Sequence, residues 1–251
     1  MKFFILCKNE ASNIKKCIES LLNCGMEVVV MDSGSVDDTL RIVSQYPVEL
    51  VNYKYTNHCD AYNQITSSES QSVCGIFDAD MEMTMALAEE IRSIHSDIDV
   101  VKSPVQMYVE GVPLKRGSLY PPKPIVFRTG RAYFESIGHG ECLVTGIKLV
   151  CTKSVLIHND LKDYFRYLES QVRYAEKLAD LASKGHLTWR DRLRVKTPLL
   201  IAIAPLYSLF VRGGVFSREG WLYAIDRLIA EAIMYHRSLR RNILGERDKS
   251  S

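Results

Sequence analysis

Apolar and polar positions along the first half of the chain follow a pattern of short strands and helices. Phe3 to Cys7 is an apolar run of strand length. Residues 14–22 then carry apolar side chains at helical spacing, and Gly25 is a typical helix stop. Val28 to Met31 predicts a second strand, which ends at Asp32.

The same alternation continues further along the chain. Asp37 can cap a short helix, Leu50 to Tyr53 predicts a third strand, and Asp60 to Ser67 predicts another helix. Val73 to Phe77 predicts a fourth strand that delivers Asp78. Four such units are typical of a right-handed, doubly wound α/β sheet, in which ligands bind beyond the carboxyl ends of the strands.

The second half of the chain has a different pattern. Val100 to Ile157 consists of short β-rich pieces broken by glycine and proline, so we expect a mixed or antiparallel extension of the sheet. After His158 the pattern is almost entirely helical. We therefore expect an α/β fold, with a mixed doubly wound sheet flanked by helices over residues 1–183 and a helical appendage over residues 184–251.

Composition changes this picture mainly through charge. The 251 residues are 47% hydrophobic and 25% charged, enough for a folded core rather than a disordered chain. Residues 1–183 carry 19 Lys and Arg against 24 Asp and Glu, whereas residues 184–251 carry 13 against 6. The seven cysteines include no CxxC pair, so we expect structural thiols, and the start of the chain has no signal-peptide pattern, which favours the cytoplasm.

The basic appendage contains an apolar stretch from Thr197 to Val211 that includes Pro198 and Pro205. It is shorter than the roughly 20 residues that span a bilayer, and Lys and Arg flank it, so we expect an interfacial helix or hairpin on an anionic membrane surface. A second helix over Arg218 to Arg241 carries an apolar stripe that could equally pack inside the protein or form a homo-oligomer contact. The basic residues of the appendage alternate with long apolar stretches rather than with aromatic residues that could stack on bases, which disfavours nucleic acid as a partner.

Polar side chains follow three of the predicted strands. Asn9 and Glu10, Asp32, and the pair Asp78 and Asp80 all lie at carboxyl ends and should converge on one crevice. Two carboxylates two positions apart can hold Mg²⁺ or Mn²⁺ beside a diphosphate. The alternatives are that Asp78 and Asp80 only begin a turn and cap the next helix, and that Asp32 only caps the turn after its strand.

Four motifs stand in a fixed order along the chain: Cys7-Lys8-Asn9-Glu10 with Asn13-Ile14, Val30 to Ser35 with Asp37-Asp38-Thr39, Asn63, and Phe77-Asp78-Ala79-Asp80. Together they resemble family 2 glycosyltransferases of the GT-A fold, in particular the small lipopolysaccharide-core β-glucosyltransferase-like group. The resemblance implies that residues 1–183 form a catalytic domain that binds a nucleotide sugar.

The resemblance also implies individual roles. Asp32 would contact the nucleotide base, Asp78 the ribose or the metal, and Asp80 the Mg²⁺ or Mn²⁺ on the diphosphate. Asn9 and Glu10 would line the nucleotide pocket.

A base must take the proton of the attacking acceptor hydroxyl. The segment Ile137-Gly138-His139-Gly140-Glu141 resembles the position of a His-Glu pair in the family, although Gly140 separates the two residues here. Glu141 is our first candidate and His139 the second; the alternative is a polar loop.

Further candidates come from the second half of the chain and from Asn63, which would contact the nucleotide sugar. His158 resembles a family histidine that approaches the metal or the diphosphate, and a purely structural strand-end residue is the alternative. Arg128 and Arg173 could contact phosphates or the sugar, together with Tyr174. Solvated helix charge is the alternative for Arg173.

The sequence thus predicts an inverting, metal-dependent transferase that moves a sugar, with UDP-hexose as the expected donor, to a lipid-linked or lipopolysaccharide-type acceptor. We expect it at the inner face of the cell membrane as a peripheral protein. One rival is a Mg²⁺-dependent nucleotidyltransferase, although Lys8 to Ala11 is not the Gly-rich loop such enzymes use. The other is a non-catalytic membrane-associated binding protein.

Overall fold

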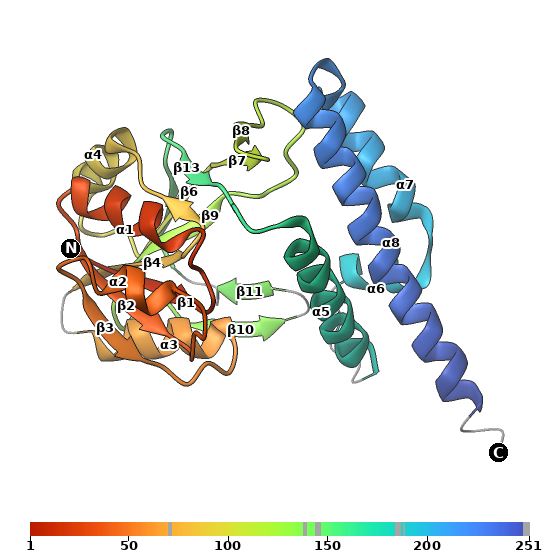
Figure 1. Cartoon of the computed structure of the whole chain (residues 1–251), viewed down its shortest axis with the longest axis horizontal. Helices are drawn as coiled ribbons and strands as arrows, with labels where there is room; N and C mark the ends of the chain where they lie inside the picture. The colour runs from red at the N-terminus through yellow and green to blue at the C-terminus, as the bar shows by residue number, and fades with distance from the viewer. Residues whose placement is uncertain (70–71, 138–139, 144–146, 184–186, 188, 248–251) are drawn as a thin grey trace. The chain divides into compact units, whose positions relative to one another are not determined.

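The structure is a computed structural model that describes residues 1–69, 72–137, 140–143, 147–183, 187 and 189–247 (Figure 1). The described chain divides into two units. The first, which we call the sheet unit, comprises Met1–Pro113, Tyr120–Glu135 and Leu143–Leu161. The second, the helical unit, comprises the described parts of Leu114–Leu119, Ser136–Cys142 and Lys162–Ser251.

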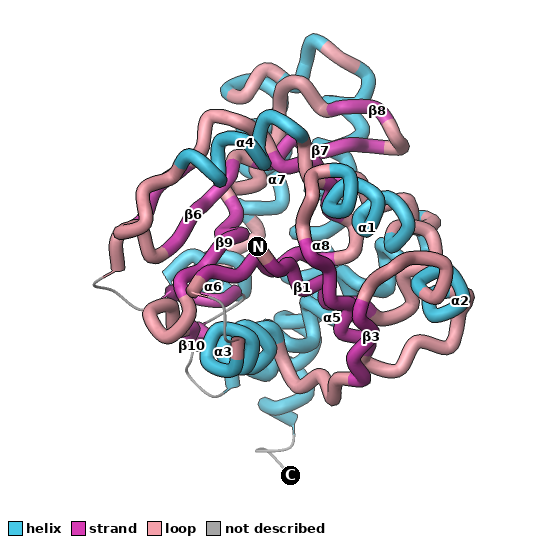
Figure 2. The backbone as a smooth tube through the Cα atoms, turned by 90° about the vertical axis from the view of Figure 1, so that its left-hand side faces the viewer, coloured by secondary structure: helices cyan, strands magenta, loops and turns pink. Residues whose placement is uncertain are grey.

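A seven-stranded sheet of order β12-β6-β9-β4-β1-β2-β3 organises the described part of the sheet unit. The strands β4, β1, β2 and β3 are parallel, whereas β9 runs antiparallel to both of its neighbours, β4 and β6. Figure 2 shows β6, β9, β1 and β3 following one another across the unit. The strand bounds are β1 Lys2–Cys7, β2 Glu27–Asp32, β3 Glu49–Asn52, β4 Val73–Asp78, β6 Val100–Ser103, β9 Lys123–Arg128 and β12 Leu149–Cys151.

Helices cover both faces of this sheet because its central strands are apolar on both sides. Phe3 and Ile5 of β1 belong to one buried cluster, together with apolar side chains of α1, α2 and α4. Leu6 belongs to a second cluster, with side chains of α3 and β9. The helix bounds are α1 Ile14–Asn23, α2 Thr39–Val43, α3 His58–Ser68 and α4 Met85–Ser93.

Close packing inside β4 depends on a glycine. A Cβ on Gly75 would lie 2.1 Å from the ring of Phe3, and that ring packs edge-on against Phe77 at 5.1 Å between centroids. The missing side chain therefore lets the Phe3 ring lie against the Gly75 backbone, three residues before Asp78.

A smaller sheet of order β5-β13-β7-β8 lies beyond the end of β4 in the chain. Within it β13 pairs antiparallel with β5, so that His158 stands opposite Met81. A two-stranded ribbon, β10 with β11, follows β9. The bounds are β5 Met81–Glu82, β7 Val105–Val109, β8 Val112–Pro113, β10 Phe134–Ile137, β11 Gly140–Leu143 and β13 Leu156–His158.

The helical unit is held together largely by α8. Its described helices are α5 Tyr164–Ser183, α6 Trp189–Lys196, α7 Leu199–Leu206, the π-helical turn η1 Tyr207–Val211, the 3-10 turn η2 Gly214–Phe216 and α8 Arg218–Arg247. Ala175 and Leu178 of α5 bury against Val195 of α6 and Met234 of α8. This shared core places α5 in the same unit as the described residues of the basic tail.

A short excursion of the chain, Leu114–Leu119, also belongs to the helical unit. The Ser208 hydroxyl donates to the Gly117 carbonyl at 2.7 Å, and the Leu119 amide donates to the Tyr223 hydroxyl at 3.1 Å. These bonds satisfy loop backbone groups that burial would otherwise leave unpaired.

The predicted fold class is confirmed. Each of the four predicted strands and the three predicted helices of the first half is present, with ends displaced by at most two residues. The antiparallel β9 is the mixed extension expected from the second half, and the stretch from Thr197 to Val211 forms a helix, α7 with η1, rather than a hairpin.

Candidate active site at the carboxyl edge of the sheet

The ends of β4, β1 and β2 bring the predicted acidic residues to one edge. Asp78 pairs with Leu6 in the β4 to β1 ladder, and Cys7 pairs with Asp32 in the β1 to β2 ladder. The Cys17 thiol of α1 lies 3.7 Å from the Asp78 carbonyl, which fixes the helix below this edge. Asp78 and Asp32 therefore stand at the ends of the two strands that flank β1, at one edge of the sheet, as the parallel pattern predicted.

Asp78 is held by a lysine that the sequence analysis did not single out. The Lys123 ammonium donates to Asp78 Oδ2, and only 14% of the Lys123 side chain and 28% of the Asp78 side chain are exposed. Lys123 is the first residue of β9, and because β9 is antiparallel to β4, its start reaches the edge at which β4 ends. The other oxygen, Asp78 Oδ1, is buried without a hydrogen-bond partner.

The surroundings of Asp78 favour its ionised form. Burial alone would raise the pKa of the Asp78 carboxyl, but the Lys123 ammonium, with smaller contributions from His58 and His158, lowers it to about 2. His58 is the first residue of α3 and was also missed in the sequence, where it belongs to no motif. Asp78 is therefore a carboxylate surrounded by cationic and imidazole groups.

Asp80 lies two residues beyond Asp78, beside β13. The His158 Nε2 atom is 3.5 Å from Asp80 Oδ2, and the Asn159 amide donates to the Asp80 carbonyl at 3.0 Å. Asp80 Oδ1 and His158 Nδ1 are both buried without a hydrogen-bond partner. The structure thus brings Asp78, Asp80 and His158 together, with one unmet polar atom on each.

A divalent cation explains these unpartnered atoms better than a purely structural role of the three side chains does. Buried polar atoms without partners are rare and need an explanation, such as an absent ion. The described residues contain no ready group of three His, Cys, Asp or Glu ligands around one point. A cation held through Asp80 and Asp78 would therefore take its remaining ligands from diphosphate and water, which is how Mg²⁺ is commonly bound.

Asp32 is engaged by the turn that follows it. Its Oδ2 accepts from the amides of Gly34 at 2.9 Å and Ser35 at 3.0 Å, and its Oδ1 accepts from the Ser35 hydroxyl and the Cys7 thiol. Burial would raise the pKa of Asp32, but the bonds from Ser35 and Gly34 lower it overall. The carboxylate therefore performs the capping role, and contact with a base stays a prediction.

Asn9 and Glu10 form a loop that is fastened to the turn after β2. Asn9 has a positive φ of 57°, its amide donates to the Ser35 hydroxyl, and its side-chain oxygen accepts from the Val36 amide, both at 2.8 Å. The Glu10 amide donates to the Thr39 hydroxyl at 2.8 Å. The two predicted loops thus support each other at the edge, next to Asp32.

Asn63 of α3 holds the chain after β9. Its side-chain amide donates to the Phe134 carbonyl, and its side-chain oxygen accepts from the Phe134 amide, both at 2.8 Å. This bidentate contact fixes the start of β10, so Asn63 has a clear structural role, and contact with a nucleotide sugar stays a prediction.

Arg128 lies at the other edge of the sheet. It pairs with Val73, at the opposite end of β4 from Asp78, and its guanidinium lies 3.6 Å from the Asp99 carboxylate. The structure therefore does not bring Arg128 to the candidate site. Lys123, at the start of the same strand, supplies the cation there instead.

The side chains of the two predicted bases lie outside the part of the chain that the structure describes. Of the two, His139 is outside the described residues, and Glu141 lies in β11, with its backbone alone described. Arg173 and Tyr174 lie on α5 of the helical unit. Their roles stay predictions.

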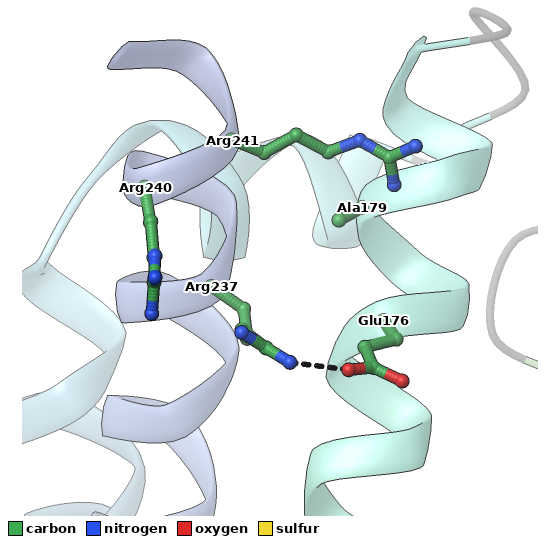
Figure 3. A pocket seen from close by; sticks show the side chains of 5 residues that line it. All are labelled: Glu176, Ala179, Arg237, Arg240 and Arg241. Atoms are coloured by element: carbon green, nitrogen blue, oxygen red, sulfur yellow. Dashed lines mark hydrogen bonds and ion pairs between the residues drawn. The ribbon is translucent and has the colours of Figure 1, made fainter. Parts of the chain in front are cut away.

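The helical unit has its own hollow, a groove of about 280 Å³ between α5 and α8 (Figure 3). Glu176 and Ala179 of α5 line it together with Arg237, Arg240 and Arg241 of α8, and Arg237 pairs with Glu176. The described residues that line it therefore give it three arginines and one carboxylate.

Comparison with known proteins identifies the family to which this chain is similar. The model of the family described as "Glycosyl transferase family 2" matches residues 3–142. A lipopolysaccharide core biosynthesis glycosyltransferase LpsC of Rhizobium meliloti is 35% identical over 39% of this chain and 38% of its own length. An uncharacterised glycosyltransferase of Rickettsia felis is 33% identical over 36% of this chain and 32% of its own. The chain thus spans about a third of the length of these curated relatives.

Solved structures are similar at a coarser level. Staphylococcus aureus TarS aligns over 96% of this chain and 91% of its own, with 16% identity and a TM-score of 0.47. A Mycobacterium tuberculosis glucosyl-3-phosphoglycerate synthase, crystallised with Mn²⁺, UDP and phosphoglyceric acid, aligns over 42% of this chain and 43% of its own, with 20% identity and a TM-score of 0.35.

Proposed function

Because the chain belongs to glycosyl transferase family 2, we propose that it transfers a sugar from a nucleotide-sugar donor to a hydroxyl acceptor with inversion at the anomeric carbon. The match over residues 3–142 bears out the resemblance seen in the four motifs. The observation that carries the proposed activity is the edge formed by Asp78, Asp80 and His158, where each side chain keeps a buried polar atom without a partner.

The reaction asks three things of the chain. It must hold the donor diphosphate at the strand ends, aim an acceptor hydroxyl at the anomeric carbon, and accept the proton of that hydroxyl. The new bond forms as the bond between sugar and diphosphate breaks, so that a nucleoside diphosphate leaves. We assign the proton to Glu141, with His139 as the second candidate.

Asp80 is the proposed principal ligand of Mg²⁺ or Mn²⁺, with Asp78 and His158 beside it. A bound cation would offset the negative charge that develops on the leaving diphosphate. We assign the loop of Asn9 and Glu10 to the nucleotide, where its backbone is already fixed by the turn after β2.

For the substrates, we propose UDP-hexose as donor and a lipid-linked or lipopolysaccharide-type saccharide as acceptor. The relative of R. meliloti, named for lipopolysaccharide core biosynthesis, supports this acceptor class. The donor follows from the motif resemblance alone.

We also propose that the helical unit contacts an anionic membrane surface. Along α7 and η1, large apolar side chains are exposed at helical spacing, with Leu199 62% and Phe210 64% exposed. Exposed cations, including Arg212, lie beside them, and such a mixture suits the lipid headgroup region. No helix among the described residues has the length and apolar character needed to cross a bilayer.

The central test is thermal unfolding with nucleoside diphosphates and nucleotide sugars, with and without Mn²⁺, followed by turnover. UDP with Mn²⁺ should raise the melting temperature of the parent protein, since ligands that bind only the folded state stabilise it. Asp80→Ala should lose this shift and nucleotide-sugar turnover while remaining folded. Full Mn²⁺-dependent turnover by Asp80→Ala would overturn the proposal.

Two controls separate the rival functions. Release of diphosphate from a nucleoside triphosphate and a sugar phosphate would indicate a nucleotidyltransferase. A non-catalytic membrane protein should show no stabilisation by any nucleotide, but should still sediment with vesicles that contain phosphatidylglycerol.

A further inference from the structure

Lys123 is a largely buried cation to which the proposed reaction assigns no role. It lies between Pro122 and Pro124, so the backbone on both sides has a restricted φ. Its ammonium donates to Asp78 Oδ2, and 14% of its side chain is exposed. A positive charge is therefore built into the edge at which a divalent cation is proposed to bind.

The pair makes the two aspartates of the motif unequal. Asp78 already has a counter-ion on one oxygen, whereas among the described residues the Asp80 carboxylate has the 3.5 Å contact with His158 Nε2 and no lysine or arginine partner. An ammonium this close both occupies a carboxylate oxygen and repels an incoming cation, and such effects are strong where solvent is partly excluded. Without nucleotide, Asp80 would therefore be able to bind Mn²⁺, whereas the charge of Asp78 would already be neutralised by Lys123.

We propose that Lys123 is a resident counter-ion that occupies Asp78 until a donor diphosphate binds, so that Asp78 becomes available to the divalent cation only in the presence of nucleotide. This inference rests on the proposed function and concerns the order of binding at the same site. Lys123 acts here as a positioning residue.

The chemistry of lysine suits this exchange. Its ammonium is a compact charge on a flexible four-carbon stem, and lysine is a common ligand of phosphate groups. A diphosphate at the strand ends offers the ammonium more negative charge than one carboxylate does. Metal and nucleotide then bind with positive coupling, and by linkage each raises the affinity of the other by the same factor.

The first measurement is Mn²⁺ binding without nucleotide, followed by the electron paramagnetic resonance signal of free Mn²⁺. Lys123→Met, which keeps the aliphatic stem but removes the charge, should bind Mn²⁺ about tenfold more tightly than the parent, because Asp78 is released and the repulsion is lost. Lys123→Arg should bind as weakly as the parent. The double variant Asp78→Asn with Lys123→Met should lose the gain.

The second measurement is the coupling between Mn²⁺ and UDP. In the parent and in Lys123→Arg, UDP should increase the affinity for Mn²⁺ strongly. In Lys123→Met this increase should be about tenfold smaller, because no counter-ion remains to be displaced. A purely structural lysine would change the melting temperature but not this ratio.

The outcomes separate the inference from the function beneath it. Unchanged or weaker Mn²⁺ binding in a folded Lys123→Met, with binding still dependent on Asp80, would overturn the counter-ion role alone. Mn²⁺ binding that is unaffected by Asp80→Ala would overturn the proposed metal site itself. Should Lys123→Met not fold, Lys123→Gln, which removes the charge but can keep a neutral hydrogen bond to Asp78, tests the loss of repulsion: it should bind Mn²⁺ more tightly than the parent, and unchanged binding would overturn the counter-ion role.

Discussion

In the helical unit, Glu231 of α8 is only 3% exposed, and each of its carboxylate oxygens faces an arginine. Arg227 pairs with Oε1, and Arg194 lies 3.2 Å from Oε2. At the edge of the sheet unit, Asp78 and Asp80 are also largely screened from solvent, but one oxygen of each has no partner. The two regions therefore bury the same chemical group in different ways.

The contrast separates structural carboxylates from ligand-binding ones. A buried charge is tolerated when ion pairs and hydrogen bonds replace its water, and it is costly when they do not. Glu231 meets that requirement within the protein. One oxygen of Asp78 and one of Asp80 keep capacity for a group from outside, so the two regions differ in the partners of their carboxylate oxygens rather than in burial.

The largest change in the free energy of unfolding should come from removing the charge of Glu231, the carboxylate that is paired on both oxygens. Glu231→Gln leaves Arg227 without this counter-ion and leaves Arg194 with Asp191 at 3.6 Å, and it should lower the free energy of unfolding by about 3–5 kcal/mol. Urea unfolding followed by circular dichroism measures this change.

Asp80→Asn is the matched control, because it removes a screened charge that the protein does not fully pair. It should leave the free energy of unfolding within about 1 kcal/mol of the parent, because it leaves no arginine without its counter-ion. Equal losses in the two variants would remove the distinction between the regions.

A smaller effect should appear as a pH dependence from Asp78. Its pKa is about 2 in the folded chain against 3.8 for the free group, so the ionised form stabilises the fold. That stability, about 2 kcal/mol, is present above about pH 4 and should be lost as the pH falls toward 2. Urea unfolding between pH 5 and pH 2 measures the slope, and Asp78→Asn should flatten it. An Asp78→Asn protein that keeps the parent slope would assign the dependence to other groups.

The smallest effect should come from the exposed pairs along the arginine groove. Arg237 pairs with Glu176 and Arg241 with Asp180, but these side chains are about a third to a half exposed. Glu176→Gln should cost less than about 1 kcal/mol, and 0.5 M NaCl, taken as a rough high-salt condition, should erase the difference. A melting-temperature comparison at low and high salt tests this. A loss of stability as large as that of Glu231→Gln would show that these exposed pairs contribute as much as the buried ion pairs of Glu231.

Much of the sheet unit is predictable because its signals are local. Phe3 to Cys7, Val28 to Met31 and Val73 to Phe77 are apolar runs that end in polar groups, and parallel pairing carries those groups to one edge. Asp78 and Asp80 were predicted as metal ligands from this logic and His158 from the family resemblance, and the structure brings the three residues together. Their role as ligands stays a prediction.

The remaining features depend on strand direction and on distant partners. Arg128 looks like the phosphate-binding cation of β9, but an antiparallel strand presents its first residue, Lys123, to the edge where β4 ends. Asn63 belongs to a motif, yet its amide is matched to the Phe134 backbone, 71 residues away. No pattern within one segment encodes either relation.

The excursion of Leu114–Leu119 into the helical unit has a practical consequence for dissecting the protein. The chain leaves the sheet unit at Pro113 and returns at Tyr120, three residues before Lys123. Truncation of the chain after Leu161 would therefore remove the hydrogen-bond partners of Gly117 and Leu119. The segment that leads to Lys123, the lysine that holds Asp78, would then no longer be anchored. The units are separate in their cores but interleaved in sequence, so domain swaps between relatives should exchange the excursion together with the helices.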